Sequence, residues 1–121
     1  MTSSNRQTTG RIGESLAAQA LTQRGYEVIE RNWRCARGEI DIVACDGDCW
    51  AFVEVKTRHG HVNEYPEEAV DERKTKRITR LARIYLAEHD LERVSWRIDV
   101  VAIELDRANA VQRLIVIPGV A

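Results

Sequence analysis

Hydrophobic positions along the chain follow two periods, which predict helices and strands in succession. Apolar residues at helical spacing predict a first helix that begins at Gly10 and ends at the stop signal of Gly25. Short alternating or continuous apolar runs predict strands at residues 26–33, 40–45, 49–56, 96–105 and 111–117. The continuous apolar run at residues 100–103 predicts a strand that is buried on both faces.

A second amphipathic segment follows Pro66, a residue that suits the first turn of a helix. The pattern predicts a long helix over residues 67–89. Its expected inward positions are Val70, Ile78, Leu81, Ala82 and Tyr85. The resulting order, α-β-β-β-α-β-β, predicts an α/β fold in which helices flank one central mixed sheet.

Length and composition are typical of one globular domain. The chain has 121 residues, of which 44% are hydrophobic and 31% are charged, and these proportions exclude a disordered chain. We expect residues 10–121 to form the domain and the polar residues 1–9 to form a flexible arm. No apolar run approaches the roughly 20 residues of a membrane-spanning helix, so we expect no membrane contact.

Cysteine usage favours a reducing compartment. The three cysteines, Cys35, Cys45 and Cys49, are an odd number, and the chain has no apolar signal core in its first residues. Their spacing does not match that of zinc ligands. We therefore expect reduced thiols in a cytoplasmic protein.

The central hairpin carries the candidate chemistry. Asp46, Gly47 and Asp48 form a strong turn signal between two predicted strands. A two-residue loop at residues 47–48 places Asp41 directly opposite Glu54, whereas a loop at residues 46–47 leaves them diagonal on the same face. In both registers Ile40, Ile42, Val53 and Val55 share the other face, which favours these registers over a three-residue loop.

Two carboxylates that face each other across a sheet repel, and a divalent cation would remove the repulsion. Oxygen ligands from Asp41 and Glu54, together with the Val55 carbonyl, suit Mg²⁺ or Mn²⁺. Lys56 is expected on the same face as Glu54, where it can hold a phosphate oxygen or orient an attacking water. The alternative is an ordinary exposed face with alternating Glu and Lys, but the whole pattern G-E-I-D, turn, F-V-E-V-K favours a site.

The near balance of 18 basic and 19 acidic residues gives a net charge of −1. This excludes a protein that holds nucleic acid by bulk positive charge alone, so phosphate contacts must come from local patches. The candidate nucleic-acid-binding residues are Arg73, Lys74, Arg77 and Arg80 on the second helix, Arg34 and Arg37 in a basic loop at residues 31–37, and Arg58 after the E-x-K strand. Trp33 in that loop either stacks on an unpaired base or packs on the sheet.

Several motifs together resemble a known family. They cover most of the chain between residues 10 and 103, and they are Gly10-x-x-Gly13-Glu14-x-x-Ala17, Asn32, Gly38-Glu39-Ile40-Asp41-Ile42-Val43, Phe52-Val53-Glu54-Val55-Lys56-Thr57-Arg58, Pro66-x-Glu68-Ala69-Val70, Lys74-x-x-Arg77-Ile78, Ala82, Tyr85-Leu86 and Arg97-Ile98-Asp99-Val100-Val101. By these motifs the chain resembles the YraN-type family of small bacterial proteins. That family is similar to the PD-(D/E)xK, or restriction-endonuclease-like, superfamily and especially to its Holliday-junction resolvases.

The resemblance implies a role for each acidic residue. Asp41 corresponds to the metal-binding Asp of the superfamily, and Glu54 with Lys56 corresponds to its E-x-K pair. Glu14, which the helical pattern alone would place on a solvated flank, corresponds to the acidic residue of the first helix. Ile40 stands where the superfamily motif has proline, a residue that contributes no functional group.

The leading hypothesis is a metal-dependent endonuclease that hydrolyses DNA phosphodiester bonds, with branched or flap DNA as candidate substrates and RNA as a further one. In this hypothesis Asp41, Glu54, Lys56 and Glu14 are catalytic, and Mg²⁺ or Mn²⁺ is the cofactor. Resemblance to resolvases also implies a homodimer. The alternatives are a nucleic-acid-binding module that does not cleave, and a protein-interaction domain without nucleic acid.

Overall fold

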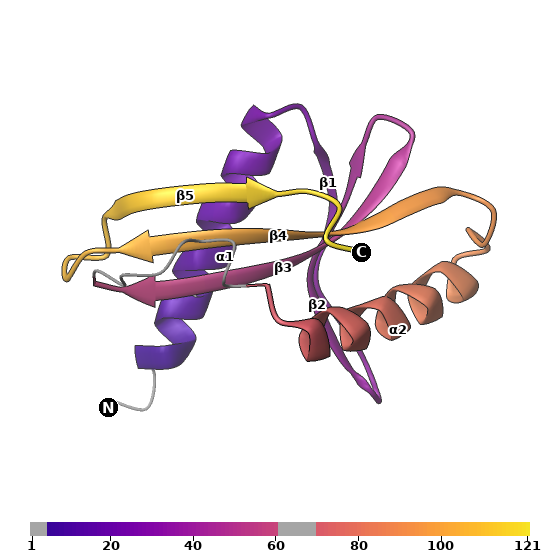
Figure 1. The fold of residues 1–121 in the computed structure, drawn as a ribbon, viewed down its shortest axis with the longest axis horizontal. Coiled ribbons are helices and arrows are strands. Elements are labelled where there is room, and N and C mark those ends of the chain that lie inside the picture. Colours follow the sequence, from indigo (N-terminus) through magenta and orange to yellow (C-terminus); the bar gives the residue numbers. More distant parts are fainter. Residues whose placement is uncertain (1–4, 61–69) are drawn as a thin grey trace.

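The computed structural model of the chain describes residues 5–60 and 70–121. Within them, the elements follow the predicted order, as α1 (Asn5–Gln23), β1 (Glu27–Cys35), β2 (Gly38–Asp46), β3 (Cys49–His59), α2 (Glu72–Glu88), β4 (Ser95–Leu105) and β5 (Val111–Ile117) (Figure 1). The predicted α/β class and the order α-β-β-β-α-β-β are confirmed.

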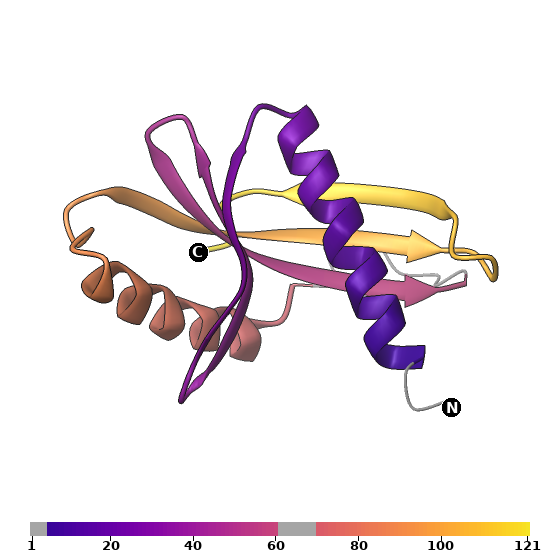
Figure 2. The same cartoon turned by 180° about the vertical axis from the view of Figure 1, so that it is seen from behind.

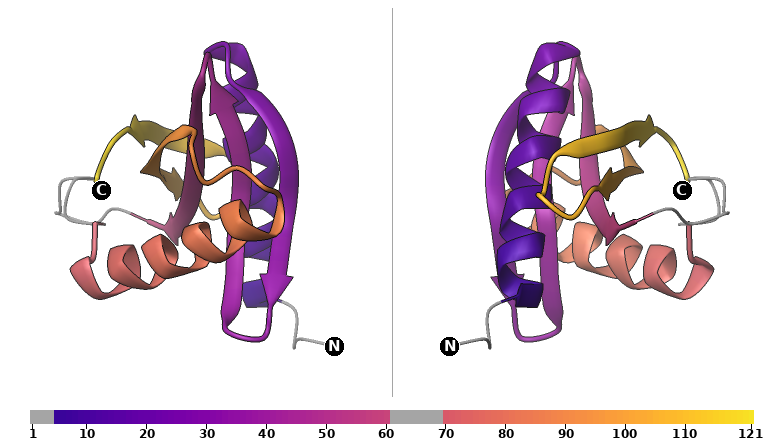
Figure 3. Two further views of the ribbon diagram at one scale, coloured as in Figure 1. Left: turned by 90° about the vertical axis from the view of Figure 1, so that its right-hand side faces the viewer. Right: turned by 90° about the vertical axis from the view of Figure 1, so that its left-hand side faces the viewer.

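The five strands form one mixed sheet in the order β1-β2-β3-β4-β5. Strands β3 and β4 are parallel, and the other neighbours are antiparallel. Helix α1 crosses one face of the sheet and α2 lies on the other (Figures 2 and 3). Strand β4 is therefore covered on both sides, and Val100, Val101, Ala102 and Ile103 each expose 9% or less, as the apolar run predicted.

Each helix packs its apolar face on a separate side of the sheet. Ala17 and Leu21 of α1 pack with Val53 of β3 in one buried cluster. Leu81 and Tyr85 of α2 lie in a second buried cluster on the opposite face. That second cluster is rich in aromatic rings, and it includes Trp33, Trp50, Phe52 and Trp96 among its buried and half-buried members. Hydrophobic burial on both faces thus holds the two helices to the sheet.

Helix α1 begins earlier than the sequence predicted. Its first residue is Asn5, so residues 5–9, which were expected in the flexible arm, are helical. The prediction used the apolar stripe, which begins only after Gly10. A polar turn can extend a helix beyond that stripe because its backbone hydrogen bonds need no apolar face.

Helix α2 begins later than the predicted start at residue 67. Residues 61–69, including His61 and Pro66, lie outside the described residues, but Val70 and Asp71 are described and precede the helix. The Asp71 carboxylate accepts hydrogen bonds from the backbone N–H groups of Arg73 (2.9 Å) and Lys74 (3.4 Å), which makes Asp71 the N-cap. The capping residue, and not the apolar period, sets where this helix begins.

In the part of the chain that the structure describes, neither helix combines the length and the apolar character that crossing a membrane requires.

Candidate functional site

The hairpin of β2 and β3 has the first of the two predicted registers. Asp46 pairs with Cys49 across the two-residue loop at Gly47 and Asp48. Gly47 has φ of 61°, the left-handed conformation that a type II′ turn requires at this position. The turn therefore selects one of the two registers that the sequence favoured.

The ladder between β2 and β3 ends at the pair of Ile42 and Val53. Beyond it, β2 continues beside β1 and β3 continues beside β4, so the two strands diverge (Figure 1). We call this opening the β2–β3 fork. Asp41 and Glu54 are the next residues along each strand, and they lie where the strands separate.

The Asp41 carboxylate accepts a backbone hydrogen bond from β3 at the point where β3 separates from β2. The N–H of Val55 donates to Asp41 Oδ2 at 2.8 Å. The register is therefore the predicted one, but the ladder stops one pair before Asp41 and Glu54, which are not paired within it. Strand β3 follows its parallel neighbour β4 away from β2, and the Asp41 side chain binds the N–H exposed by this separation.

Asn32 interrupts the alternation of side chains opposite Asp41. It stands in β1 between the pairs Arg31–Ile42 and Trp33–Ile40, and its φ of 54° is left-handed. Ile42 lies in the cluster under α1, whereas Ile40 packs with Trp33 in the cluster under α2. The prediction that Ile40 and Ile42 share a face is wrong, because the two-residue period of side chains holds only in an uninterrupted strand.

Four carboxylates influence one another at the fork. The Glu54 and Glu14 side chains are 12% and 16% exposed. Burial above all, together with the negative charges of Glu14, Glu39 and Glu54, raises the pKa of Asp41 to about 6, against the hydrogen bond from Val55. The structure thus brings the predicted residues Asp41, Glu54 and Glu14 together in a region of excess negative charge.

Gly13 lets α1 approach β3 closely enough to place Glu14 at the fork. A methyl group at Gly13 would overlap the side chain of Thr57 on β3. On the neighbouring strand β1, Arg31 lies 3.9 Å from Glu14 Oε1 and donates to Ser15 Oγ at 3.2 Å. These contacts hold the middle of α1 against the sheet beside Asp41.

Lys56 reaches the same fork from β3. Its Nζ lies 3.1 Å from Glu54 Oε1, and its side chain is 22% exposed. Burial alone would lower the pKa of Lys56, but contacts with Lys74 and Glu54 raise it. The pKa of Lys74 on α2 is lowered, chiefly by its contact with Lys56 and also by burial. A second lysine therefore joins the predicted E-x-K pair.

The oxygen donors at the fork fit part of the ligand set of Mg²⁺ or Mn²⁺. Asp41 and Glu54 supply carboxylates, and Mg²⁺ in proteins is usually held by one or two carboxylates, with waters and substrate phosphates as the other ligands. Among residues 5–60 and 70–121, no three His, Cys, Asp or Glu side chains are grouped closely enough to hold a metal ion. The arrangement suits a metal that completes its shell with other oxygens.

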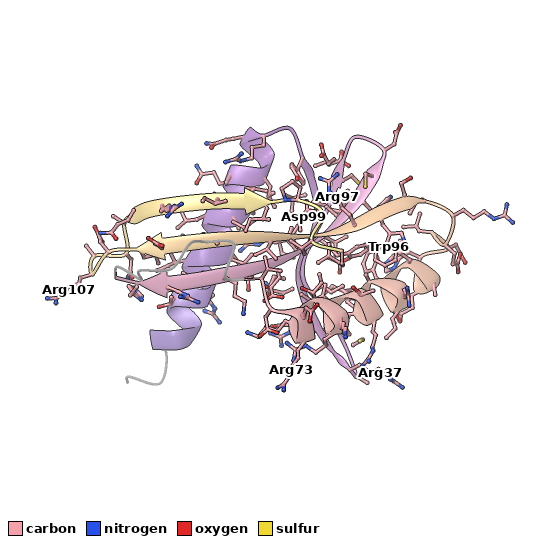
Figure 4. All side chains as sticks on the ribbon, viewed as in Figure 1. Arg37, Arg73, Trp96, Arg97, Asp99 and Arg107 are labelled. Atoms are coloured by element: carbon pink, nitrogen blue, oxygen red, sulfur yellow. The ribbon has the colours of Figure 1, made fainter. Side chains whose placement is uncertain are left out.

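The predicted nucleic-acid-binding residues divide into two groups. Arg73, Arg77 and Arg80 are exposed along α2, and Arg37 is exposed in the turn between β1 and β2. Figure 4 shows Arg73 and Arg37 on the same side of the molecule. Arg34, by contrast, is ion-paired to Glu39 at 2.9 Å. Arg58 is exposed near the end of β3, beyond Lys56.

The basic segment at residues 31–37 was predicted to be a loop, and this prediction is wrong. Strand β1 continues to Cys35, and only Ala36 and Arg37 form the turn. Trp33 is 9% exposed and makes an edge-to-face contact with Tyr85, with the ring centroids 5.3 Å apart. Packing on the sheet, the second interpretation of Trp33, is therefore confirmed.

Sequence reasoning gave no structural role to Gly13 and Asn32. A glycine inside a helix costs stability relative to alanine, which signals a close approach of another element. Asparagine is depleted in strands and tolerates the left-handed conformation, which signals a break in the pleat. Both signals were present in the sequence, but neither identifies the contacting partner.

A second cluster of charged residues surrounds the fully buried Asp99, which pairs with Val53 across β3 and β4. Arg97 donates to both carboxylate oxygens of Asp99 at 2.9 and 3.2 Å, Tyr26 Oη donates to it at 2.9 Å, and the Gly119 N–H donates at 2.9 Å. Arg97 also donates to Asp46 Oδ2 at 2.8 Å. Figure 4 labels Arg97 and Asp99, which lie beside each other on β4. This network joins β4 to the hairpin turn and to the residues after β5.

Comparison with known proteins identifies the family of this chain. Residues 13–103 match the model of "Uncharacterised protein family UPF0102". The chain belongs to the UPF0102 family. The match includes Glu14, Asp41, Glu54, Lys56 and Lys74, so the whole fork lies within the shared region.

Relatives from several bacteria match over most of their length. A UPF0102 protein of Moorella thermoacetica is 47% identical over 114 residues, which cover 94% of this chain and 95% of the relative. UPF0102 proteins of Beutenbergia cavernae and Roseiflexus castenholzii are 50% and 52% identical, covering 84% and 79% of this chain and 86% and 78% of the relatives. The UPF0102 assignment therefore rests on nearly the full domain.

Proposed function

We propose that the protein is a metal-dependent endonuclease that hydrolyses phosphodiester bonds in DNA, with branched or flap DNA as candidate substrates. The observation that carries this proposal is the grouping of Asp41, Glu54 and Lys56 at a point where two strands separate, with Glu14 beside them. The raised pKa of Asp41 beside three further carboxylates would favour a divalent cation, and the neighbouring ammonium group of Lys56 would favour a phosphate.

Each residue has a distinct role in this proposal. Asp41 and Glu54, with the Val55 carbonyl, would hold Mg²⁺ or Mn²⁺, and Glu14 would bind through water. The bound ion would supply Lewis-acid stabilisation of charge on the phosphoryl group. Lys56 would donate a hydrogen bond to a phosphate oxygen or to the attacking water, and Glu54 at 3.1 Å orients its ammonium group.

The exposed arginines of α2 would bind flanking phosphates. Arg73, Arg77 and Arg80 occupy the solvent side of the helix whose first turn contributes Lys74 to the fork. Because these contacts are electrostatic, we expect the affinity for DNA to fall steeply with salt concentration. The net charge of −1 implies weak non-specific binding overall.

The test is a cleavage assay over duplex, single-stranded, flap and four-way junction DNA with Mg²⁺ or Mn²⁺. Lys56→Ala and Glu54→Gln should each lower the cleavage rate by about 10²–10³-fold, the effect of losing one positioned charged group in an active site. Lys76→Ala and Glu88→Gln, at exposed positions on α2, serve as matched controls. Equal cleavage by wild type and Lys56→Ala would indicate a contaminating nuclease and refute the assignment.

A second candidate function is nucleic-acid binding without cleavage. It is favoured by the absence, in the described parts of the chain, of three grouped metal-ligating side chains. Salt-dependent binding of DNA or RNA in Mg²⁺ and Mn²⁺ without product formation would select this candidate. Loss of that binding in a variant that replaces Arg73, Arg77 and Arg80 by glutamine would identify α2 as the binding element.

A further inference from the structure

Arg31 lies on the side of β1 that faces α1. It pairs with Ile42, which belongs to the buried cluster beneath α1, and paired residues of neighbouring strands point to the same face of a sheet. Two residues later, Trp33 packs in the cluster beneath α2. The left-handed backbone of Asn32 separates the two. The break in β1 therefore directs Arg31 towards α1, where the carboxylate of Glu14 lies.

The contact between Arg31 and Glu14 is an ion pair without a hydrogen bond. The Nη2 atom of Arg31 lies 3.9 Å from Glu14 Oε1, beyond hydrogen-bonding distance, and the same atom donates to Ser15 Oγ at 3.2 Å. By contrast, Arg34 on the same strand donates to the carboxylate of Glu39 at 2.9 Å. Arg31 thus offsets part of the charge of Glu14 without a hydrogen bond to its carboxylate.

Glu14 is also within electrostatic reach of the fork. Its negative charge is among those that raise the pKa of Asp41. A divalent cation bound by Asp41 would be attracted to Glu14 and repelled by the guanidinium of Arg31, because the Coulomb energy depends on the sign and distance of each charge. One carboxylate therefore faces two cations, a fixed arginine and an exchangeable metal ion. Tighter binding of Glu14 by either cation weakens its interaction with the other.

We propose that Arg31 is a positioning residue that holds Glu14 in the metal-free protein and competes for it with the divalent cation of the fork. Before a metal binds, the guanidinium offsets part of the repulsion among the carboxylates. With a metal bound, Glu14 accepts hydrogen bonds from its water ligands, and the ion pair with Arg31 weakens. The presence of a divalent metal at the fork rests on the proposed function.

The test measures the dissociation constant of Mn²⁺ for the full chain without nucleic acid, from the electron paramagnetic resonance signal of the free ion. Arg31→Gln should lower this constant about threefold to fivefold, the upper range for a partly exposed ion pair. Glu14→Gln should raise it about tenfold, because the water ligands lose a hydrogen-bond acceptor. Arg31→Lys should keep it within about twofold of wild type, because a charge that makes no hydrogen bond does not need the planar guanidinium.

Two comparisons separate competition for Glu14 from general repulsion of the metal. In the Glu14→Gln background, Arg31→Gln should change the Mn²⁺ dissociation constant by less than about twofold, because the shared carboxylate is gone. Arg24→Gln removes the same charge from an exposed position just after α1, about 15 Å from Glu14 along the helix axis. It should also change the constant by less than about twofold, because salt screens charges at that separation.

An equal effect of Arg31→Gln with and without Glu14 would overturn the competition. An unchanged dissociation constant in Arg31→Gln would overturn it too, although the Mn²⁺ site itself would stand.

These measurements also separate the role of Arg31 from the proposed function. Mn²⁺ binding that tightens in Arg31→Gln, without cleavage of any nucleic acid, supports the role of Arg31 and counts against the nuclease. Cleavage with Mn²⁺ that binds equally to wild type and Arg31→Gln supports the nuclease and overturns the role of Arg31. Absence of Mn²⁺ binding from both proteins overturns both.

Discussion

Two groups of charged side chains lie within the same sheet, one around Asp99 and the other around Asp41. Asp99 is fully buried, and its carboxylate accepts hydrogen bonds from the Arg97 guanidinium, the Tyr26 hydroxyl and the Gly119 N–H. Asp41 accepts one backbone N–H and is otherwise surrounded by the charges of Glu14, Glu39 and Glu54. The negative charge of Asp99 is therefore compensated by a cationic partner within the chain, and the negative charge of Asp41 is not.

This difference separates a charge that the fold compensates from one that it leaves uncompensated. The contact with Asp99 raises the pKa of Arg97, so the pair stays ionised and joins β4 to its neighbours. At the fork, burial raises the pKa of Asp41, which marks a carboxylate whose charge the protein alone does not stabilise. The same amino acid thus stabilises the fold at one position and costs stability at the other.

The largest expected effect comes from removing the charge of Asp99 from its cluster with Arg97. Asp99→Asn removes the negative charge that pairs with Arg97 and should lower the free energy of unfolding by about 3–5 kcal/mol, because it leaves a charge largely without its partner. Urea unfolding monitored by circular dichroism measures this change. A loss below about 1 kcal/mol would contradict the structural role assigned to Asp99.

The next effect tests the divalent cation that we propose at the fork. With Mn²⁺ at about 100 times its dissociation constant, the free energy of unfolding should rise by about 2.7 kcal/mol. Asp41→Asn should lose most of this stabilisation, because the site loses a carboxylate ligand. Asp48→Asn, at an exposed position in the hairpin turn, is the control. Equal stabilisation of Asp41→Asn and wild type would place the metal elsewhere.

A smaller effect tests how α1 reaches the fork. Gly13→Ala should destabilise the protein by about 2 kcal/mol, because the added methyl group overlaps Thr57. Gly10→Ala on the same helix meets nothing within 4 Å, and it should stabilise by about 0.5–1 kcal/mol through helix propensity. Thermal unfolding of both variants gives the comparison. The same sign for both would mean that α1 does not need its close contact with β3.

The smallest effect comes from the charge of Asp41 in the metal-free protein. The pKa of the Asp41 carboxyl is about 6 in the folded chain and about 3.9 in the unfolded chain. Between these two pH values the folded state binds more protons than the unfolded state. The free energy of unfolding of the wild type therefore falls as pH rises through this window. A shift of about two pKa units corresponds to at most about 2.8 kcal/mol. Because the amide oxygen of asparagine accepts a weaker hydrogen bond from the Val55 N–H than a carboxylate does, Asp41→Asn should be more stable than wild type by only about 1 kcal/mol at pH 7.

The pH series provides the check on this last prediction. Urea unfolding with a chelator should show the advantage of Asp41→Asn shrinking from pH 6 towards pH 4, where the wild-type carboxyl is protonated. Asp99→Asn is the comparison, since the same substitution there should destabilise. Destabilisation by Asp41→Asn at pH 7 would show that the Asp41 charge is compensated in the folded protein.

Local sequence patterns accounted for most of the elements and part of the site. The turn at Gly47 fixed the register of β2 and β3, and the apolar period of α2 correctly placed Ile78, Leu81 and Tyr85 inward. These features depend on residues that are neighbours in sequence, whose geometry a local pattern encodes. Helix ends were less accurate, because the cap of α2 and the polar turn of α1 lie outside the apolar stripe.

The sequence pattern did not predict the geometry of the β2–β3 fork. The ladder ends at Ile42 and Val53 because β3 follows β4, a strand whose residues begin more than 35 positions later in the chain. Ile40 changes face at the break beside Asn32, which a two-residue period does not describe. The contact between Lys56 and Lys74 likewise joins a strand and a helix that are separate in sequence.

The sequence by itself determined the residue types of the site, Asp41, Glu54 and Lys56, and the hairpin that brings their strands together. Only the tertiary structure decided that the strands separate at Asp41 and that Lys74 joins the group. The physical reason is that periodicity and turn chemistry act over a few residues. Which charges remain uncompensated depends on burial and on partners brought together by the folded sheet.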